Sequence, residues 1–144
     1  MIITVDTNVI FSGLYSATGA SHRILNLVLD EKLKLAVSTQ IYFEYYDVLT
    51  RIDSLKKMHL TAAEVEEVLD LVALLSQKNA IYYLLRPNLI DETDNIFIEC
   101  AFASNSDYLI TSNVRDFSSG ELKNMGFEIV TPGQFYQIWR GQNE

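Results

Sequence analysis

Short apolar runs alternate along the chain with longer stretches in which apolar residues recur every three or four positions. The short runs are rich in β-branched residues and predict buried strands. They fall at residues 2–5, 35–37, 80–84, 108–110 and 127–130. The longer stretches predict amphipathic helices. They fall at 9–14, from 21 to about 33, from 39 to about 51, from 62 to about 77, from 94 to about 103 and from 132 onward. This alternation predicts a parallel sheet covered by helices on both faces.

Small polar residues mark the starts of several of these helices. Thr61, followed three residues later by Glu64, predicts a capping box at the start of the helix that begins at residue 62. Other candidate caps are Ser21, Ser38 or Thr39, and Thr93. Pro132 suits the first turn of the last helix. These signals agree with the periodicity about where the helices begin.

The length and composition indicate one globular domain. The chain has 144 residues, of which 49% are hydrophobic and 21% charged, a balance typical of a folded domain with a single core. We predict one domain over residues 1–140, a loop over residues 86–92, and a disordered tail over residues 141–144. No apolar run approaches the roughly 20 residues that a membrane span needs.

Cys100 is the only cysteine, so neither an intramolecular disulfide nor a zinc site built on several thiolates can form. A reducing compartment such as the cytoplasm fits this composition. The N-terminal run, which meets Asp6 after four apolar or β-branched residues, is typical of a first strand rather than of a signal peptide. Helical spacing places Cys100 on the inward face of its helix. The same face carries Ile96, Phe97, Ala101 and Ala103. Cys100 is therefore expected to be buried and inert.

Three acids stand close to the predicted carboxyl ends of strands. Asp6 closes the first strand, Glu44 lies in the helix that follows the second, and Asp94 opens a helix after the third. Asn113 follows the fourth strand. The functional crevice of an open parallel sheet lies outside the carboxyl ends of its strands. We therefore predict that these four polar residues approach one cleft.

Carboxylates crowded in this way repel one another unless a cation neutralises them. With oxygen donors and no thiolate cluster, Mg²⁺ or Mn²⁺ is the expected ion. The formal net charge of −8 argues against a protein that holds nucleic acid by a basic surface alone, so phosphate chemistry would need a cation. Metal-assisted hydrolysis of a phosphodiester is the chemistry that this arrangement favours.

A family resemblance rests on four segments of the chain. They are VDTNVIF at the N-terminus, STQIYFEYYDVLTR around Glu44, DETDNIFIECAFASNSDYLITSN, and the following VRDF. Together they resemble a PIN domain of the branch that contains ribonuclease toxins, and the likeness covers nearly the whole chain. It implies a Rossmann-like three-layer α/β sandwich with a central parallel sheet of four to five strands. It also implies metal-dependent cleavage of single-stranded RNA and a homodimer. For a toxin, it implies a small antitoxin partner.

Carried over residue by residue, Asp6, Glu44 and Asp94 resemble the catalytic, metal-binding acids of the family. Asn113 stands where many members have a fourth acid, and Asp116 is a candidate to supply that carboxylate as a metal ligand. The polar residues that resemble those lining the cleft are Asn8, Thr111, Ser112 and Asn113, and they are assigned a supporting role.

Several of these residues also fit simpler roles. Asp94 can be an acid in a first helical turn, stabilised by the helix dipole. Three tyrosines near Glu44 can stack on bases, but at least two of them are expected to lie in the core. They are Tyr42, Tyr45 and Tyr46. The basic residues that can touch a phosphate backbone are Lys32, Lys34, Arg51, Lys56 and Lys57. His22 and His59 lie outside the acidic segments and are not expected to act as a base.

Two other functions compete with the nuclease. An aspartyl phosphotransferase or receiver domain would need a second acid close after Asp6 and a downstream lysine, whereas Asn8 occupies the first place. A PIN-like module that binds RNA or protein without cutting is the stronger rival, because Asn113 contributes no charge where an acid is expected.

Overall fold

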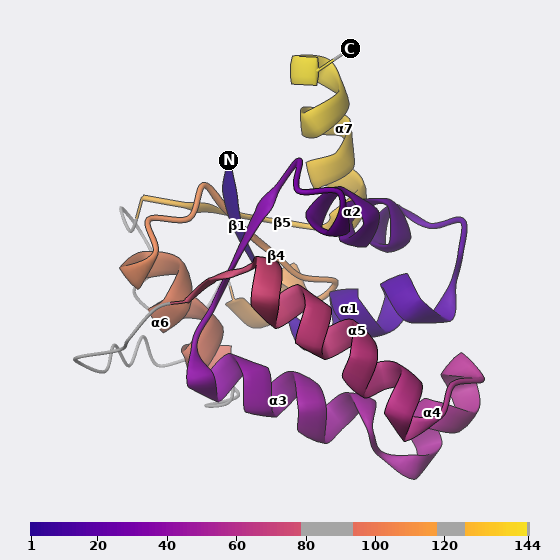
Figure 1. Cartoon of the computed structure of the whole chain (residues 1–144). Helices are drawn as coiled ribbons and strands as arrows, with labels where there is room; N and C mark the ends of the chain where they lie inside the picture. The colour runs from indigo at the N-terminus through magenta and orange to yellow at the C-terminus, as the bar shows by residue number, and fades with distance from the viewer. Residues whose placement is uncertain (79–93, 118–125, 144) are drawn as a thin grey trace.

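The computed structural model describes residues 1–78, 94–117 and 126–143. Within them the chain forms a five-stranded parallel sheet with the strand order β3-β2-β1-β4-β5 (Figure 1). The strands are β1 (Ile2–Val5), β2 (Lys34–Val37), β3 (Gln77–Lys78), β4 (Tyr108–Ile110) and β5 (Glu128–Val130). The predicted α/β class and parallel sheet are therefore confirmed.

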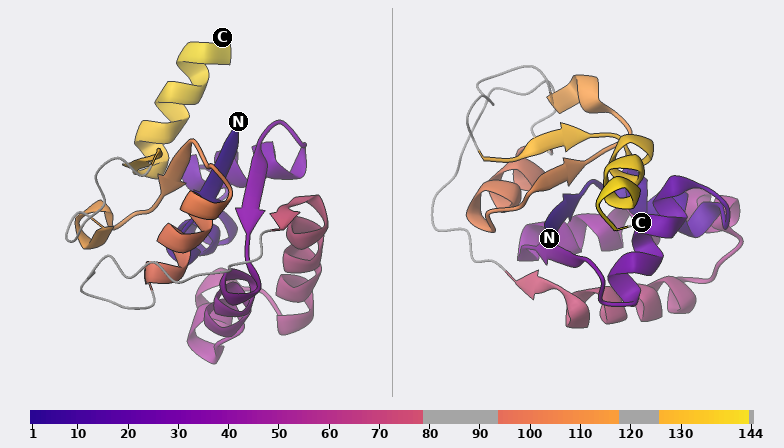
Figure 2. Two further views of the ribbon diagram at one scale, coloured as in Figure 1. Left: turned by 90° about the vertical axis from the view of Figure 1, so that its left-hand side faces the viewer. Right: turned by 90° about the horizontal axis from the view of Figure 1, so that it is seen from above.

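Helices cover both faces of the sheet. The helices are α1 (Thr7–Tyr15), α2 (Ala20–Leu29), α3 (Thr39–Leu49), α4 (Ile52–Met58), α5 (Ala62–Leu75), α6 (Asn95–Ala103) and α7 (Pro132–Asn143), with a 3-10 turn η2 (Val114–Phe117). Helix α6 packs against β1, β2 and β4, while α1, α2 and α7 lie on the other side (Figure 2). Helix α3 lies at the carboxyl end of the strands, where it contacts α1, α5 and α6.

Strand β1 is the centre of the sheet and is covered on both sides. Ile3 pairs with Leu35 of β2 and with Tyr108 of β4, so β1 is hydrogen-bonded along both edges. Its residues 3–5 are buried, in keeping with an unbroken apolar strand of a doubly covered sheet. Because all strands are parallel, their carboxyl ends meet at one edge. This edge carries Asp6 and Thr111, two of the predicted site residues.

The helix signals in the sequence were mostly correct. Thr61 and Glu64 form the predicted capping box, with hydrogen bonds of 3.0 and 3.2 Å, and Ser38 Oγ caps α3 by accepting from the Ile41 N–H. Pro132 is the first residue of α7. The cap at Ser21 was wrong, because α2 begins at Ala20 and follows Gly19, whose extended backbone needs no side-chain cap.

Several local features departed from the predicted pattern. Helix α4 was not predicted, because a helix of seven residues carries too little periodicity to detect. Ala103 is exposed rather than inward-facing, since the buried face of α6 turns toward Asn95 and Glu99. The predicted strand 80–84, the loop 86–92 and the cap at Thr93 lie outside the described residues. Helix α7 extends to Asn143 and so includes residues 141–143, which we predicted to lie in a disordered tail.

Among the described residues, no helix combines the length and the apolar character that a bilayer crossing requires.

Cys100 of α6 lies in the hydrophobic core, as predicted, with none of its surface exposed. Burial raises the pKa of its thiol to about 12, although a hydrogen bond with Thr4 acts in the opposite direction. Only the thiolate reacts readily with a disulfide reagent. At pH 8, we expect Cys100 of the folded protein to react with such a reagent about three orders of magnitude more slowly than in urea. Equal rates in both states would contradict the burial described here.

Candidate active site

Four small polar residues follow directly after strands at the carboxyl edge of the sheet. They are Asp6 after β1, Ser38 after β2, Thr111 after β4 and Thr131 after β5. The backbone of this edge is continuous, because the Asp6 N–H donates to Ile110 O (2.9 Å) and the Thr111 N–H donates to Val130 O (3.0 Å). The edge therefore places polar groups side by side on adjacent strands.

Asp6 is the best-fixed acid of this edge. It occupies the cap position of α1 but makes no side-chain cap hydrogen bond, and it is only 9% exposed. Its Oδ2 instead accepts from Thr111 Oγ1 (2.7 Å) and from Asn8 Nδ2 (3.3 Å). Two donors from different segments hold the carboxylate in one orientation. Hydrogen bonds to a carboxylate are among the stronger ones in proteins.

The turn after β4 is built around the same carboxylate. The hydroxyl of Thr111, which donates to Asp6, also accepts from the Asn113 N–H (3.0 Å). The Ser112 N–H donates to Asn8 Oδ1 (3.2 Å), so Asn8 joins this turn to α1. The structure thus brings the four residues that were assigned a supporting role to Asp6, although Ser112 and Asn113 take part through their backbone. The side chains of Ser112 and Asn113 are exposed.

Glu44 and Asp94 come from elements that border this edge. Glu44 is half-buried in the middle of α3, and Asp94 is half-buried at the cap position of α6. Helix α3 contacts α6, and α6 packs on β1, so the segments that carry the three acids adjoin one another. Asp116 is half-buried in η2, where its N–H donates to Asn113 O (3.0 Å).

Buried polar residues accompany the acids in ways that the sequence did not reveal. Asn95, directly after Asp94, is 2% exposed, and Thr7, directly after Asp6, is 6% exposed. Within the described part of the chain, neither Asn95 Oδ1 nor Thr7 Oγ1 has a hydrogen-bond partner. Glu99, one turn beyond Asn95, is 4% exposed. Polar groups on the buried face of an otherwise apolar helix were the signal that could have identified Asn95 and Glu99.

These groups fit a hard divalent cation in the kind of donor that they offer. Carboxylate, amide and hydroxyl oxygens are the ligands of Mg²⁺ and Mn²⁺, and the buried oxygens of Thr7 and Asn95 each adjoin an acid. Across residues 1–78, 94–117 and 126–143, however, no three His, Cys, Asp or Glu side chains are grouped closely enough to hold a metal ion. Like charges repel when no cation lies between them, so ligation by all three acids would require their side chains to approach one another.

The aromatic residues around Glu44 divide into buried and exposed ones. Tyr45 is 1% exposed and belongs to the core, so it cannot stack on a base. Tyr46 is 39% exposed and Phe43 is 63% exposed. Phe43 and Tyr42 line a pocket of about 560 Å³ beside the carboxyl end of β2, into which Lys78 also faces. The exposed aromatic surface of α3 therefore lies next to Glu44.

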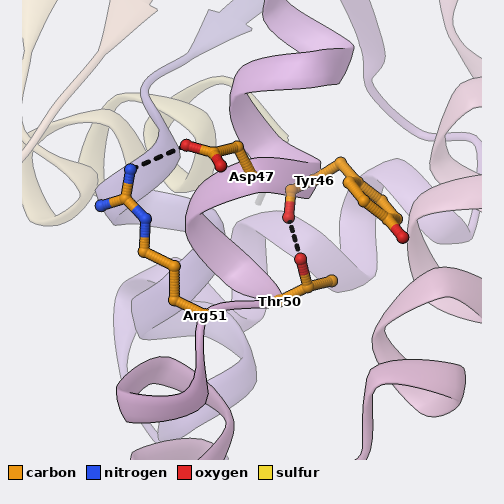
Figure 3. A network of polar contacts seen from close by, with 4 residues as sticks. All are labelled: Tyr46, Asp47, Thr50 and Arg51. Carbon is orange, nitrogen blue, oxygen red and sulfur yellow. Dashed lines mark hydrogen bonds and ion pairs between the residues drawn. The ribbon is translucent and has the colours of Figure 1, made fainter.

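Two of the candidate basic residues already have partners. Arg51 forms an ion pair with Asp47 one helical turn away (2.7 Å), next to the Thr50 hydroxyl that donates to Tyr46 O (Figure 3). Lys34 Nζ donates to Leu75 O (3.1 Å). The Arg51–Asp47 pair is largely exposed and contributes little to stability. Asp47 offsets the positive charge of Arg51, while the bond to Leu75 occupies a donor of Lys34 without changing its charge.

Comparison with known proteins assigns the family. The family model of the PIN domain matches residues 3–115, so the chain belongs to the PIN domain family, whose members are generally nucleases. No curated protein matches it. Among solved structures, it resembles a chain of VapBC2 from Rickettsia felis, crystallised with a DNA fragment from their promoter. The identity is 17% and the TM-score 0.61, with 91% of this chain and 98% of that chain covered, so this likeness shows the fold.

The bond from Thr111 to Asp6 can be tested by stability measurements. Thr111 is fully buried, so Thr111→Val removes a donor to a carboxylate and an acceptor of the Asn113 N–H without changing the shape much. We expect this change to lower the free energy of unfolding by about 2–3 kcal/mol. Thr111→Ser, which keeps the hydroxyl and loses one methyl group, should cost about 1 kcal/mol. Urea denaturation in EDTA measures both, and equal losses would show that the hydroxyl is unimportant.

Proposed function

We propose that this protein is a metal-dependent endoribonuclease that cuts single-stranded RNA. The observation that carries the proposal is the carboxylate of Asp6, held by Thr111 and Asn8 at the carboxyl edge of a PIN-domain sheet. Asp6, Glu44 and Asp94 are the catalytic acids of this proposal and would hold Mg²⁺ or Mn²⁺, with Asp116 as an additional ligand. A bound ion of this kind supplies the positive charge that stabilises a phosphate under in-line attack.

The residues around Asp6 have a distinct task in this proposal. Thr111 and Asn8 fix the direction of its carboxylate, so that one ligand is already in place before an ion arrives. Preorganised groups of this kind cost little reorganisation during a reaction. Glu44 and Asp94 would complete the set of ligands. The backbone N–H of Asn113 supports Thr111 in turn.

The charge of the chain explains why an ion is needed. A protein with a formal net charge of −8 repels a polyanion unless positive charge is supplied locally. Two of its cations are engaged with their own chain, as the Arg51–Asp47 and Lys34–Leu75 contacts show. Exposed Phe43, beside Glu44, offers a face on which an unpaired base can stack without a demand for sequence.

The broader setting of the proposal is a toxin–antitoxin pair. Supporting it is the likeness in fold to a chain of the VapBC2 structure from Rickettsia felis, which is bound to a DNA fragment from their promoter. We infer a small antitoxin protein as partner, a homodimer as the assembled form of the chain, and the cytoplasm as its location. An antitoxin that places a cationic side chain at the Asp6 edge would be complementary to its charge.

The second candidate function is a PIN-like module that binds RNA or a protein without cutting. Two observations favour it. Asn113 stands where an acid is expected, and among the described residues no three His, Cys, Asp or Glu side chains lie close enough together to hold a metal ion. Titration with Mn²⁺ separates the two functions. A nuclease should bind Mn²⁺ saturably and lose that binding in Asp6→Asn, whereas a non-catalytic module should show no saturable heat.

Cleavage itself is tested with labelled single-stranded RNA and Mn²⁺. We expect the wild-type protein to cut it, and EDTA to abolish cutting. Asp94→Asn should lower the rate by at least about a hundredfold, because the loss of one ligand typically costs the metal site that much or more. Cutting that persists unchanged in Asp94→Asn would mean a contaminating nuclease or a different site.

Glu44→Gln separates a catalytic acid from a structural one. The substitution keeps the shape of the half-buried side chain and removes a charge that repels the other acids. We expect cutting to be abolished while the melting temperature without metal stays the same or rises. A large fall in melting temperature would instead assign Glu44 to the fold.

A further inference from the structure

Tyr45 of α3 contacts the end of β1 and the first turn of α6, the two segments that lie next to Asp6 and Asp94. It follows Glu44 in α3, and its side chain is 1% exposed. Its hydroxyl donates to the carbonyl oxygen of Val5, the residue directly before Asp6. Its ring lies against Phe97 of α6, with ring centroids 6.3 Å apart. One side chain therefore connects α3 to the end of β1 and to α6.

The hydrogen bond to Val5 forms beyond the last pair of residues that joins β1 to β2. Pairing of β1 with β2 runs from Ile2–Lys34 to Ile3–Leu35. Two residues further on, the Val5 carbonyl accepts from Tyr45, while the next N–H, that of Asp6, donates to Ile110 O of β4. The Val5–Asp6 peptide is thus held from two sides. The orientation of this peptide determines the direction in which the Asp6 side chain leaves the backbone.

The ring contact extends the same connection to the third acid. Phe97 lies three residues after Asp94, in the first turn of α6, and is 1% exposed. A shift of α3 would therefore move Tyr45 against both Val5 and Phe97. The other tyrosines of α3 do not reach these segments in this way: the Tyr42 hydroxyl donates to Asp70 (3.0 Å) and the Tyr46 hydroxyl to Glu66 (2.8 Å), both on α5.

The environment keeps the Tyr45 hydroxyl a donor. Burial raises its pKa well above the usual value, and the charges of Cys100 and Asp6 act in the same direction. The direction of the bond follows from its geometry, because the Val5 carbonyl oxygen can only accept and the Tyr45 hydroxyl must donate.

We propose that Tyr45 is a positioning residue, which sets the distance of Glu44 and of Asp94 from Asp6 by clamping α3 and α6 to the end of β1. The proposal rests on the metal-dependent function assigned to these acids. Tyr45 itself touches neither ion nor substrate. It would define the frame in which Glu44 and Asp94 approach the carboxylate of Asp6, which Thr111 and Asn8 already hold.

The test compares Tyr45→Phe with Tyr42→Phe and Tyr46→Phe. Each variant loses one hydroxyl from α3, but only the first loses the bond to β1, and Tyr42 and Tyr46 flank Glu44 on either side. We expect Tyr45→Phe to weaken Mn²⁺ binding roughly tenfold, the effect of one lost buried hydrogen bond. Both controls should bind Mn²⁺ within about twofold of the wild type. Calorimetric titration measures the affinities.

Amide hydrogen exchange without metal gives a second readout, which does not depend on the nuclease function. Tyr45→Phe should speed exchange in two separate segments, residues 2–9 and residues 40–48, because one bond joins them. The controls should speed exchange only in residues 40–48 and in α5. Exchange of the wild type with added Mn²⁺ should slow in both segments together, which tests the same link in an unaltered protein.

The outcomes separate the two proposals. If wild-type protein binds no Mn²⁺ but Tyr45→Phe loosens both segments, the metal-dependent function fails and the clamp stands. If Mn²⁺ binds equally well to Tyr45→Phe and wild type, or if exchange rises in residues 40–48 alone, the positioning role is overturned. An equal loss of Mn²⁺ affinity in all three variants would also overturn it, since anchoring of α3 by any hydroxyl would then suffice.

Discussion

The orientation of the peptide between Val5 and Asp6 is the constraint on which the site depends. β1 is the central strand, and its last peptide gives its N–H to Ile110 while its carbonyl receives the Tyr45 hydroxyl. The carboxylate that follows is then directed by Thr111 and Asn8. Backbone and side chain of one residue are thus fixed by three other segments. Such fixing is what a charged group needs if it is to stay in place at a low-dielectric edge.

The remaining acids are more exposed to solvent than Asp6. Asp6 is almost buried, whereas Glu44 in the middle of α3 and Asp94 at the start of α6 are half-buried. Side chains of this exposure can turn away from one another in water, which relieves their mutual repulsion. A site with one buried carboxylate and two more exposed ones would bind an ion by closing around it. The buried member decides where that closure takes place.

The sequence predicted the sheet well because each central strand is an apolar, β-branched run that ends at a polar residue. Asp6 and Thr111 could be placed at one edge for that reason alone. The role of Tyr45 could not be predicted, since Tyr42, Tyr45 and Tyr46 are the same residue type within two turns, and only the tertiary packing, which includes Phe97, shows that Tyr45 is the fully buried one. Asn95 and Glu99 were missed because buried polar groups contradict the apolar pattern from which a helix face is inferred. The third strand was predicted at 80–84, outside the described residues, whereas β3 is described at Gln77–Lys78, where the apolar periodicity had predicted the end of a helix.

The chain begins at β1 and finishes in α7, and both ends lie at the side of the sheet opposite to α3 (Figure 2). Strand β1 of four residues spans only about 13 Å, yet that length separates its start from the edge that carries Asp6, and α7 leads the other end of the chain away from that edge (Figure 2). Additional polypeptide joined at either terminus would start at the side of the sheet opposite to α3. Purification tags and fluorescent fusions can therefore be attached there while the acidic edge stays accessible to a long, flexible polymer.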